Sequence, residues 1–272
     1  MRTLLRGGAV VSGSGTQKLD ILVENETIYQ VGQALTAGGA EVVDCAGRLL
    51  FPGFIDGHTH FDLEVGGTIT ADDFASGSRA ALRGGTTMVV DFAAPDKGDT
   101  LAYGLERWRE KAAGRSACDY GFHMTIDDWN AGISRELSEM MEQGVSSFKM
   151  YMTYPAMMLP EGDMYRALRR LRELGGIAGV HCENSGLIDA LTAQAKAAGR
   201  MAPASHPRTR PAPLEAEAVG HLLRMAQVAD VPVIIVHLSA RESLEEVRAA
   251  RRRGQTVYVE TCPHYLLLED SV

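Results

Sequence analysis

The first fifty or so residues alternate between short apolar and polar positions and are interrupted by glycine, serine and asparagine. Alternation with a period of two is typical of half-buried β-strands. Five segments follow this pattern, at residues 4–5, 10–11, 20–24, 27–31 and 41–43. We therefore expect residues 1–51 to form a small β-rich domain of the sandwich type.

After Pro52 the pattern changes to apolar runs separated by longer amphipathic segments. The apolar runs predict strands at residues 54–60, 86–92, 120–126, 145–151, 177–181, 232–238 and 256–261. The intervening segments predict helices at residues 72–83, 101–113, 134–143, 163–174, 185–198, 213–229 and 240–253. Strands and helices that alternate at this spacing predict an α/β fold. Seven such units favour a (β/α)8 TIM-like barrel over a doubly wound sheet.

The predicted barrel is one strand short. Only 220 residues follow Pro52, whereas a (β/α)8 barrel typically takes about 250. An open barrel would leave backbone groups unpaired at its edges. We therefore expect residues 52–272 to be an incomplete barrel domain without its last strand, and the chain to be the N-terminal portion of a longer protein.

Composition and charge narrow the function classes. The chain is 45% hydrophobic and 23% charged, as in ordinary globular proteins. Its net charge of −8 argues against a nucleic-acid partner, which needs a basic surface. The sequence has no run of about 18 apolar residues, so we expect no membrane partner and no secretion. The widely spaced cysteines favour a reducing, cytoplasmic location; they are Cys45, Cys118, Cys182 and Cys262.

Two histidines end the first predicted barrel strand. His58 and His60 are two positions apart, so their side chains lie on the same face of the strand and converge. Neutral imidazole nitrogens bind divalent metals such as zinc. The pair alone is weak evidence, because nearby histidines are more often surface or satisfied core residues.

Polar residues also mark three later strands. Lys149 lies on the fourth predicted strand, His181 ends the fifth, and His237 lies near the end of the sixth. The carboxyl ends of the strands carry the active site in (β/α)8 enzymes. Packing alone does not readily explain histidines on three strands together with a strand lysine, so the joint pattern indicates a metal centre.

Lys149 needs a chemical route to such a centre, because an ammonium group has no lone pair. Burial lowers the pKa of a lysine toward the neutral amine. A neutral amine can react with carbon dioxide to give a carbamate, whose two oxygens can bridge two metal ions. Without the histidines, a snorkelling or salt-bridged lysine is the simpler interpretation.

With their flanking segments, these residues resemble the cyclic amidohydrolases of the amidohydrolase superfamily, and within it the dihydropyrimidinase/hydantoinase group. The resemblance covers essentially the whole chain. The matching segments are PGFIDGHTHFD (52–62), GGTITADDFASGSRAALRGGTTMVVDF (66–92), GVSSFKMYMTYP (144–155), GVHCEN (179–184), RPAPLEAEAV (210–219), VIIVHLS (233–239) and ETCPHYLLLED (260–270).

The resemblance implies a role for each candidate. His58 and His60 would bind one divalent ion, and His181 and His237 the other. Lys149, carboxylated on its side-chain nitrogen, would bridge the two ions, which are zinc or another divalent metal. Tyr154 matches the tyrosine that hydrogen-bonds the developing oxyanion in this family. The family's catalytic aspartate lies at the end of the eighth strand, which we expect to be missing here.

The resemblance also implies the reaction. We expect a hydrolase that opens a cyclic ureide or amide, either hydantoin or 5,6-dihydropyrimidine, to give an N-carbamoyl amino acid in pyrimidine degradation. Without the aspartate, general acid–base assistance of about 10²–10⁴-fold is lost, so we expect low turnover. The family also implies a homo-oligomer, commonly a tetramer, for the full-length form. Ring preference and enantioselectivity stay open.

Two alternatives remain at this stage. Dihydroorotases and allantoinases share the fold and the metals, but dihydroorotases typically have arginine two residues after the second histidine, where this chain has Asp62. A non-catalytic scaffold, or an inactive fragment of the same family, is the alternative from a different class. Such scaffolds have usually lost the metal ligands, and this chain has kept them.

The remaining histidines and nearby carboxylates have simpler interpretations. We expect His123 to be packed within a strand, and His206 and His221 to be solvated. Asp56 and Asp62 flank the histidine pair and are expected to fix the loop or support the ligands.

Overall fold

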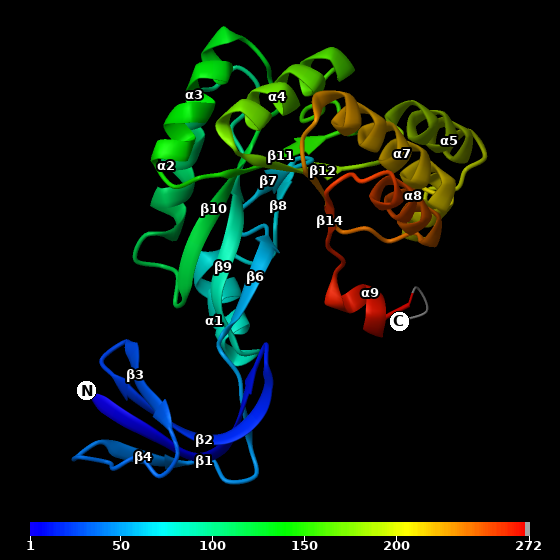
Figure 1. Ribbon diagram of the computed structural model, residues 1–272. Helices are drawn as coiled ribbons and strands as arrows, with labels where there is room; N and C mark the ends of the chain where they lie inside the picture. Colours follow the sequence, from blue (N-terminus) through cyan, green and yellow to red (C-terminus); the bar gives the residue numbers. More distant parts are fainter. Residues whose placement is uncertain (270–272) are drawn as a thin grey trace. The chain divides into compact units, whose positions relative to one another are not determined.

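The computed structural model describes residues 1–269 (Figure 1). The chain divides into two compact units. One comprises residues 1–56 and 80–88, and the other comprises residues 57–79 and the chain from residue 89 onward. The start of the first barrel strand therefore groups with the small unit, five residues beyond the expected boundary at residue 51. Of the expected second domain, residues 270–272 lie outside the described part of the chain.

The small unit is a five-stranded sheet in the order β3-β2-β1-β4, with β5 also paired to β1. Strands β1 and β2 pair antiparallel, with a bulge between Leu5 and Gly8. The buried carboxylate of Asp20 accepts hydrogen bonds from the backbone N–H groups of Gly7 and Leu35, at 2.8 and 3.0 Å. The strands are β1 (Arg2–Ser12), β2 (Gly15–Glu24), β3 (Thr27–Gly32), β4 (Glu41–Asp44) and β5 (Leu49–Leu50).

The larger unit is built on a seven-stranded sheet in the order β14-β13-β12-β11-β10-β9-β6. Strands that follow one another in the chain thus lie side by side, and the pairings from β10 to β14 are parallel. The strands are β6 (Phe54–Thr59), β9 (Thr86–Ala93), β10 (Asp119–Thr125), β11 (Ser147–Tyr151), β12 (Ile177–His181), β13 (Val233–Ile235) and β14 (Val257–Val259).

Helices connect these strands, as the alternating pattern predicts (Figure 1). They are α1 (Phe74–Arg83), α2 (Leu101–Ala112), α3 (Ala131–Glu142), α4 (Glu161–Leu174), α5 (Ser185–Ala197), α7 (Ala212–Ala229) and α8 (Arg241–Arg252). The expected α/β class, with an incomplete parallel barrel and a small N-terminal β unit, is confirmed. Strands β6 and β14 end the strand order, and each has one neighbour within residues 1–269.

Several boundaries differ from the sequence-based expectation. Strand β13 ends at Ile235, so His237 lies two residues beyond it, and not on the strand. Helix α3 begins three residues before the expected Ser134, because the Asn130 side chain accepts hydrogen bonds from the N–H groups of Gly132 and Ile133. Six short elements were not predicted: β5 (Leu49–Leu50), β7 (Glu64–Val65), β8 (Thr68–Ile69), η1 (Pro203–Ser205), α6 (His206–Thr209) and α9 (Pro263–Leu267).

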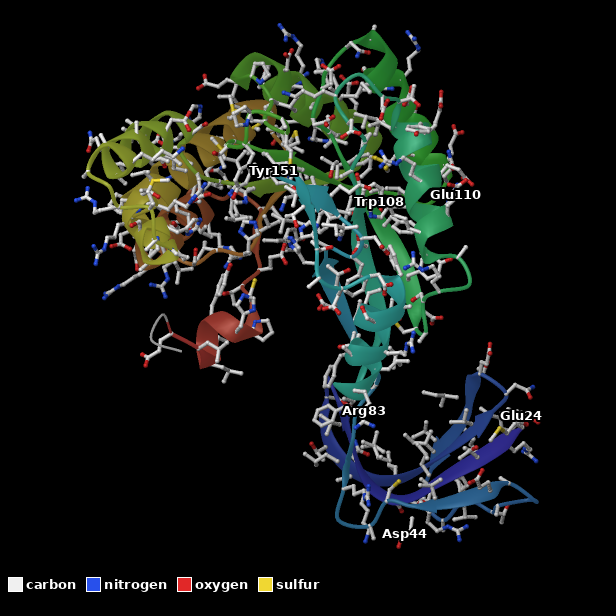
Figure 2. The ribbon with its side chains drawn as sticks, turned by 180° about the vertical axis from the view of Figure 1, so that it is seen from behind. Glu24, Asp44, Arg83, Trp108, Glu110 and Tyr151 are labelled. Atoms are coloured by element: carbon white, nitrogen blue, oxygen red, sulfur yellow. The ribbon has the colours of Figure 1, made fainter. Side chains whose placement is uncertain are left out.

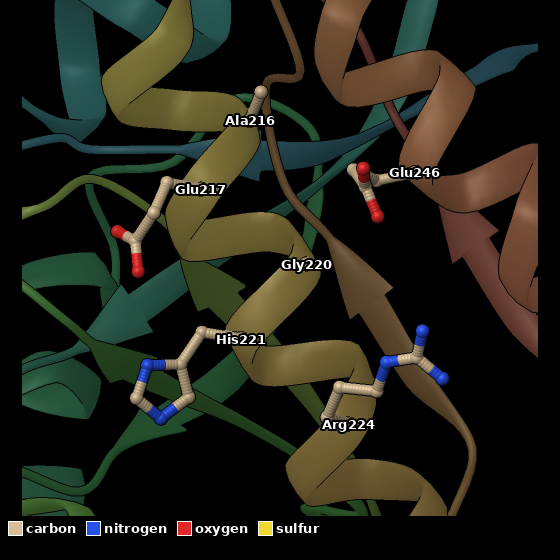
Figure 3. Close-up of a pocket in the computed structure, with 6 residues that line it drawn as sticks. All are labelled: Ala216, Glu217, Gly220, His221, Arg224 and Glu246. Carbon is tan, nitrogen blue, oxygen red and sulfur yellow. The ribbon is translucent and has the colours of Figure 1, made fainter.

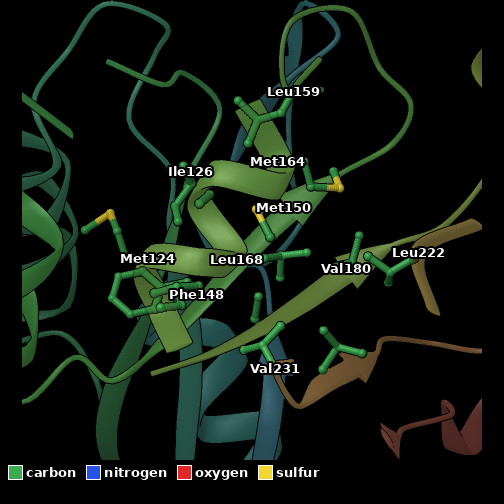
Figure 4. Close-up of a cluster of buried hydrophobic side chains, with 14 of the residues drawn as sticks. Met124, Ile126, Phe148, Met150, Leu159, Met164, Leu168, Val180, Leu222 and Val231 are labelled. Atoms are coloured by element: carbon green, nitrogen blue, oxygen red, sulfur yellow. The ribbon is translucent and has the colours of Figure 1, made fainter. Parts of the chain in front are cut away.

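The core of the larger unit lies between the strands and the helices that follow them. Phe148 and Met150 of β11 pack there with Leu168 of α4 (Figure 4). Trp108 on α2 is buried, whereas Glu110 on the same helix is exposed (both labelled in Figure 2). This division of each helix into a buried and an exposed side is what the amphipathic pattern requires. Within residues 1–269, no helix is both long enough and apolar enough to cross a membrane.

We expect Leu168→Ala to lower the free energy of unfolding by about 2–5 kcal/mol, because the fully buried side chain leaves a cavity in a packed core. Leu187→Ala on α5 is the matched control, since that leucine is 48% exposed and its truncation should cost little. Urea denaturation measures both. Equal losses for the two variants would contradict the assignment of the core.

Candidate functional site

Four histidines meet at the carboxyl ends of the strands in two pairs. The Nε2 atoms of His58 and His60 are 3.2 Å apart. The Nδ1 atom of His181 is 3.0 Å from Nε2 of His237. The ring centroids of His58 and His237 are 5.5 Å apart, so the two pairs are neighbours. The structure thus brings together all four histidines that the sequence singled out.

Hydrogen bonds to two glutamates determine which ring nitrogens of His58 and His181 carry lone pairs. A carboxylate only accepts hydrogen bonds, so Nδ1 of His58 donates to Glu260 at 2.9 Å, and Nε2 of His181 donates to Glu183 at 2.7 Å. The nitrogens left with lone pairs are His58 Nε2 and His181 Nδ1. These are the atoms that face the partner histidines. A carboxylate behind the imidazole is the usual support of a metal-binding histidine.

The spacing within each pair suits a shared metal ion. Two nitrogen ligands on one tetrahedral zinc, each about 2.0–2.1 Å from the ion, lie about 3.3–3.4 Å apart. The observed separations of 3.2 and 3.0 Å are close to this value. No group of three or more His, Cys, Asp or Glu side chains within residues 1–269 is arranged to hold a metal ion. Each pair would therefore need further donors.

Lys149 is the candidate for those donors. Its side chain is 0% exposed, and its Nζ lies 5.1 Å from the ring centroids of Phe92 and Tyr151. Burial lowers the pKa of Lys149 to about 7, against the opposing effect of the Glu260 carboxylate. A substantial fraction of this side chain is therefore a neutral amine near neutral pH, the form that can take up carbon dioxide.

Burial and nearby charge keep three of the four imidazoles neutral. Burial lowers the pKa of His60 to about 3 and of His237 to about 2, and the charge of Lys149 contributes to both shifts. The pKa of His181 is lowered as well, mainly by burial. These imidazoles are therefore neutral at pH 7, as metal binding requires.

Two buried polar atoms in this region lack a hydrogen-bond partner among the described residues. One is Nδ1 of His60, and the other is the hydroxyl of Thr125. Thr125 pairs in register with Lys149 on the neighbouring strand, so both side chains lie on the same face of the sheet. Buried polar groups are almost always partnered. A polar group added to Lys149, such as a carbamate, would lie on the same face of the sheet as the unpartnered Thr125 hydroxyl.

Tyr154 lies at the rim of the site and is 38% exposed. Its ring centroid is 5.1 Å from that of His181, and the Arg210 guanidinium lies 5.5 Å from the tyrosine ring. Burial raises the pKa of Tyr154, with Arg210 opposing the shift, so the hydroxyl keeps its proton at neutral pH. A hydroxyl that can donate a hydrogen bond is thus present on a ring next to His181.

The backbone of Tyr154 has a positive φ of 67°, which residues other than glycine rarely adopt. Lys97 supports this turn, because its Nζ donates to the carbonyl oxygens of Pro155 and Met158 at 2.9 and 3.2 Å. Asp62 and His237 also have positive φ, at 52° and 37°. Strained residues of this kind concentrate at functional sites.

A cavity of about 900 Å³ opens beside the second histidine pair. Its size is in the range of small-molecule sites. Arg210 reaches into it and forms an ion pair with Glu183 at 2.5 Å, which in turn holds His181. Its polar lining residues include Tyr154, His181, Glu183, Arg210, His237 and Ser239.

The sequence-based analysis missed Glu183, Glu260 and Arg210. Glu183 had a usable signal, because it follows His181 by two residues, the spacing that puts alternate side chains of an extended segment on one side. Glu260 had none, since it contacts His58 across 202 residues of sequence.

The other histidines serve different purposes. His123 donates from Nε2 to the Gly57 carbonyl at 2.9 Å and accepts at Nδ1 from Ser147 at 2.5 Å, so neither nitrogen is available to a metal. His206 is exposed and borders the cavity. His221 lies on α7, 3.6 Å from Glu161. It lines a separate surface hollow with Glu217, Arg224 and Glu246 (Figure 3), which contains none of the four paired histidines.

Asp62 fixes the loop after the first pair, as expected for a carboxylate at this position. It accepts a hydrogen bond from the backbone N–H of Phe74 at 3.0 Å and forms an ion pair with Arg115 at 3.4 Å. Lys111 donates to the Asp62 carbonyl oxygen at 2.6 Å.

Comparison with known proteins agrees with this geometry. The sequence pattern of the Amidohydrolase family matches residues 49–271. The chain is 42% identical to a D-hydantoinase of Streptomyces coelicolor over 275 residues and 40% identical to a D-hydantoinase of Geobacillus stearothermophilus over 273 residues. These alignments cover 98% and 100% of this chain. The chain spans 58% of the length of each of these relatives.

Solved structures give the same result. The crystal structure of a dihydropyrimidinase from Brevibacillus agri superposes with a TM-score of 0.97 at 40% identity. That superposition covers 99% of this chain and 59% of the dihydropyrimidinase. An L-hydantoinase from Arthrobacter aurescens, at 24% identity and a TM-score of 0.86, shares the fold and covers 99% and 60% of the two chains.

We expect the chelator-treated protein to lose stability as the pH falls from about 7 to about 4. The unfolded chain binds protons at histidines with a pKa near 6.5, whereas folded His60 and His237 stay neutral. Each such histidine makes the free energy of unfolding fall by about 1.4 kcal/mol per pH unit below that pKa. In His60→Gln, the free energy of unfolding measured by urea denaturation should fall less steeply as the pH falls. The difference should be about 1.4 kcal/mol per pH unit, because the unfolded chain binds one proton fewer. An unchanged slope would contradict the neutral state of His60.

Proposed function

We propose that this chain, which belongs to the amidohydrolase family, carries the metal centre of a hydrolase that opens cyclic amide rings. The proposed reaction is C–N cleavage of a hydantoin or a 5,6-dihydropyrimidine to an N-carbamoyl amino acid. The observation that carries the proposal is the meeting of two histidine pairs beside a fully buried lysine. The names of the relatives, D-hydantoinase and dihydropyrimidinase, support the substrate class.

In this proposal His58 and His60 would hold one divalent ion and His181 and His237 another, and the carbamate of Lys149 would be a ligand to both. Bound there, two zinc ions would activate a water molecule and stabilise negative charge that develops on oxygen. The residues of the chain do the orienting. Glu260 and Glu183 hold the imidazoles of His58 and His181 in the tautomers that place a lone pair on each inward nitrogen.

Tyr154 donates a hydrogen bond to the oxyanion in the proposed mechanism. Its hydroxyl is protonated at neutral pH, and the cavity beside it is large enough for a substituted five- or six-membered ring. Arg210 contacts both the Tyr154 ring and Glu183. A single arginine thus links the proposed oxyanion donor to the support of a proposed metal ligand.

The alternative functions are less well supported. The position at which dihydroorotases typically have arginine is Asp62, and its carboxylate is engaged by Phe74 N–H and Arg115. A non-catalytic scaffold would not need to keep four histidines and a buried lysine together. Allantoinase stays an alternative, because the residue at position 62 argues against dihydroorotase and not against allantoinase.

The proposed function includes a cellular location and an oligomeric state. Cys45, Cys118, Cys182 and Cys262 are all free thiols, which fits a reducing, cytoplasmic location. We also propose a homo-oligomer, commonly a tetramer, for the full-length form.

Metal content tests the proposed centre. We expect about two zinc ions per chain, by elemental analysis, when the protein is expressed with zinc and bicarbonate. Lys149→Ala should lose most of this metal, because the bridging donor is gone. Lys196→Ala, at an exposed position on α5, is the matched control and should retain it. A folded wild-type chain without metal would refute the proposed centre.

A panel of four rings tests the substrate class. Hydantoin, dihydrouracil, allantoin and dihydroorotate are offered to the zinc-loaded protein, and ring opening is followed by product analysis. We expect slow opening of hydantoin and dihydrouracil, and none of dihydroorotate, because no arginine follows His60 by two positions. Tyr154→Phe should lower the hydantoin rate by about 10²–10³-fold through loss of the oxyanion donor. Preference for dihydroorotate would contradict the proposal.

A further inference from the structure

Asp91, near the end of β9, is 0% exposed and accepts four hydrogen bonds. Its Oδ2 atom accepts from the Thr59 hydroxyl at 2.9 Å and from the Phe61 N–H at 2.8 Å. Its Oδ1 atom accepts from the Trp108 indole at 2.9 Å and from the Phe92 N–H at 2.8 Å. A buried carboxylate of this kind is costly unless its oxygens are satisfied, and here both are.

The two Oδ2 contacts bracket one histidine. Thr59 and Phe61 are the chain neighbours of His60, and a single oxygen atom binds both. The backbone on either side of His60 is thereby fixed to β9. Strand β6 ends at Thr59, so no further strand pairing holds His60 itself.

His60 has no side-chain support of the usual kind. His58 and His181 each donate to a glutamate, which fixes the orientation of the ring. Nδ1 of His60 is buried and has no hydrogen-bond partner within the described residues. The ring of His60 must therefore be oriented by its backbone and by packing.

Phe92 supplies the packing. Its ring centroid lies 4.5 Å from that of His58 and 4.8 Å from that of His60. Consecutive strand residues point to opposite faces, so the Asp91 carboxylate and the Phe92 ring contact the His58–His60 segment from different sides. These two residues hold the first histidine pair between them.

We propose that Asp91 is the positioning residue for the first histidine pair and does for His60 what Glu260 does for His58. It acts on the backbone of residues 59 and 61 and not on the imidazole. The inference deepens the proposed function and rests on it, because it takes His58 and His60 to be metal ligands. Ligand histidines that lose such support typically bind metal about 10–100-fold more weakly.

Two single-bond variants test the inference on the 272-residue chain. Thr59→Val is nearly isosteric and removes one hydrogen bond to Oδ2, on the side of the histidines. Trp108→Phe removes one hydrogen bond to Oδ1, on the side away from them. Zinc affinity is measured by competition with a chromophoric chelator, and stability by urea denaturation. We expect Thr59→Val to weaken zinc binding about tenfold. Trp108→Phe should leave zinc affinity unchanged although it destabilises the fold.

Asp91→Asn provides a second test. The amide nitrogen that replaces one carboxylate oxygen cannot accept the two hydrogen bonds that this oxygen accepts. We expect about 10–100-fold weaker zinc binding if this variant folds. Equal zinc affinity in wild type and Thr59→Val would overturn the inference. The inference would also be overturned if zinc affinity fell in proportion to the free energy of unfolding in both Thr59→Val and Trp108→Phe. A folded wild-type chain that binds no zinc would instead overturn the proposed function.

Discussion

The contact between His58 and Glu260 joins the two ends of the sheet. These residues lie 202 positions apart, with His58 in β6 and Glu260 directly after β14, the two strands at the ends of the sheet order. Such a contact requires the sheet to curl until its end strands approach at their carboxyl ends. The curvature also brings His237, beyond β13, within ring contact of His58. The distance between the two histidine pairs therefore depends on this curvature.

Burial sets the chemistry of the groups that the curvature collects. The imidazoles of His60 and His237 are neutral because proton binding would place charges in a desolvated region beside Lys149. The same desolvation favours the neutral amine of Lys149. The glutamates contact the outward nitrogens, where one of them also pairs with Arg210. The inward nitrogens of His58 and His181 thus carry lone pairs.

The sequence was sufficient to predict the fold, because the spacing of apolar residues reflects which side of each strand or helix is buried. Alternating strands and helices appear in the chain at nearly the expected positions, and the five candidate residues of the centre follow from their places near strand ends. Residues whose role depends on distant partners could not be found this way. Glu260 contacts His58 from the other end of the sheet. Asp91 is buried inside a strand, and its four hydrogen-bond donors are identified only in the folded structure. Helix α9 was missed because it is only five residues long.

The two histidine pairs differ in the length of chain that separates their members. His58 and His60 are two residues apart, whereas His181 and His237 are 56 residues apart. The entropy lost on bringing two groups together grows with the logarithm of the intervening loop. Bringing the members of the first pair together therefore costs less entropy than bringing those of the second pair together. Ligand binding that needs His181 and His237 is coupled to the folding of the whole segment between them.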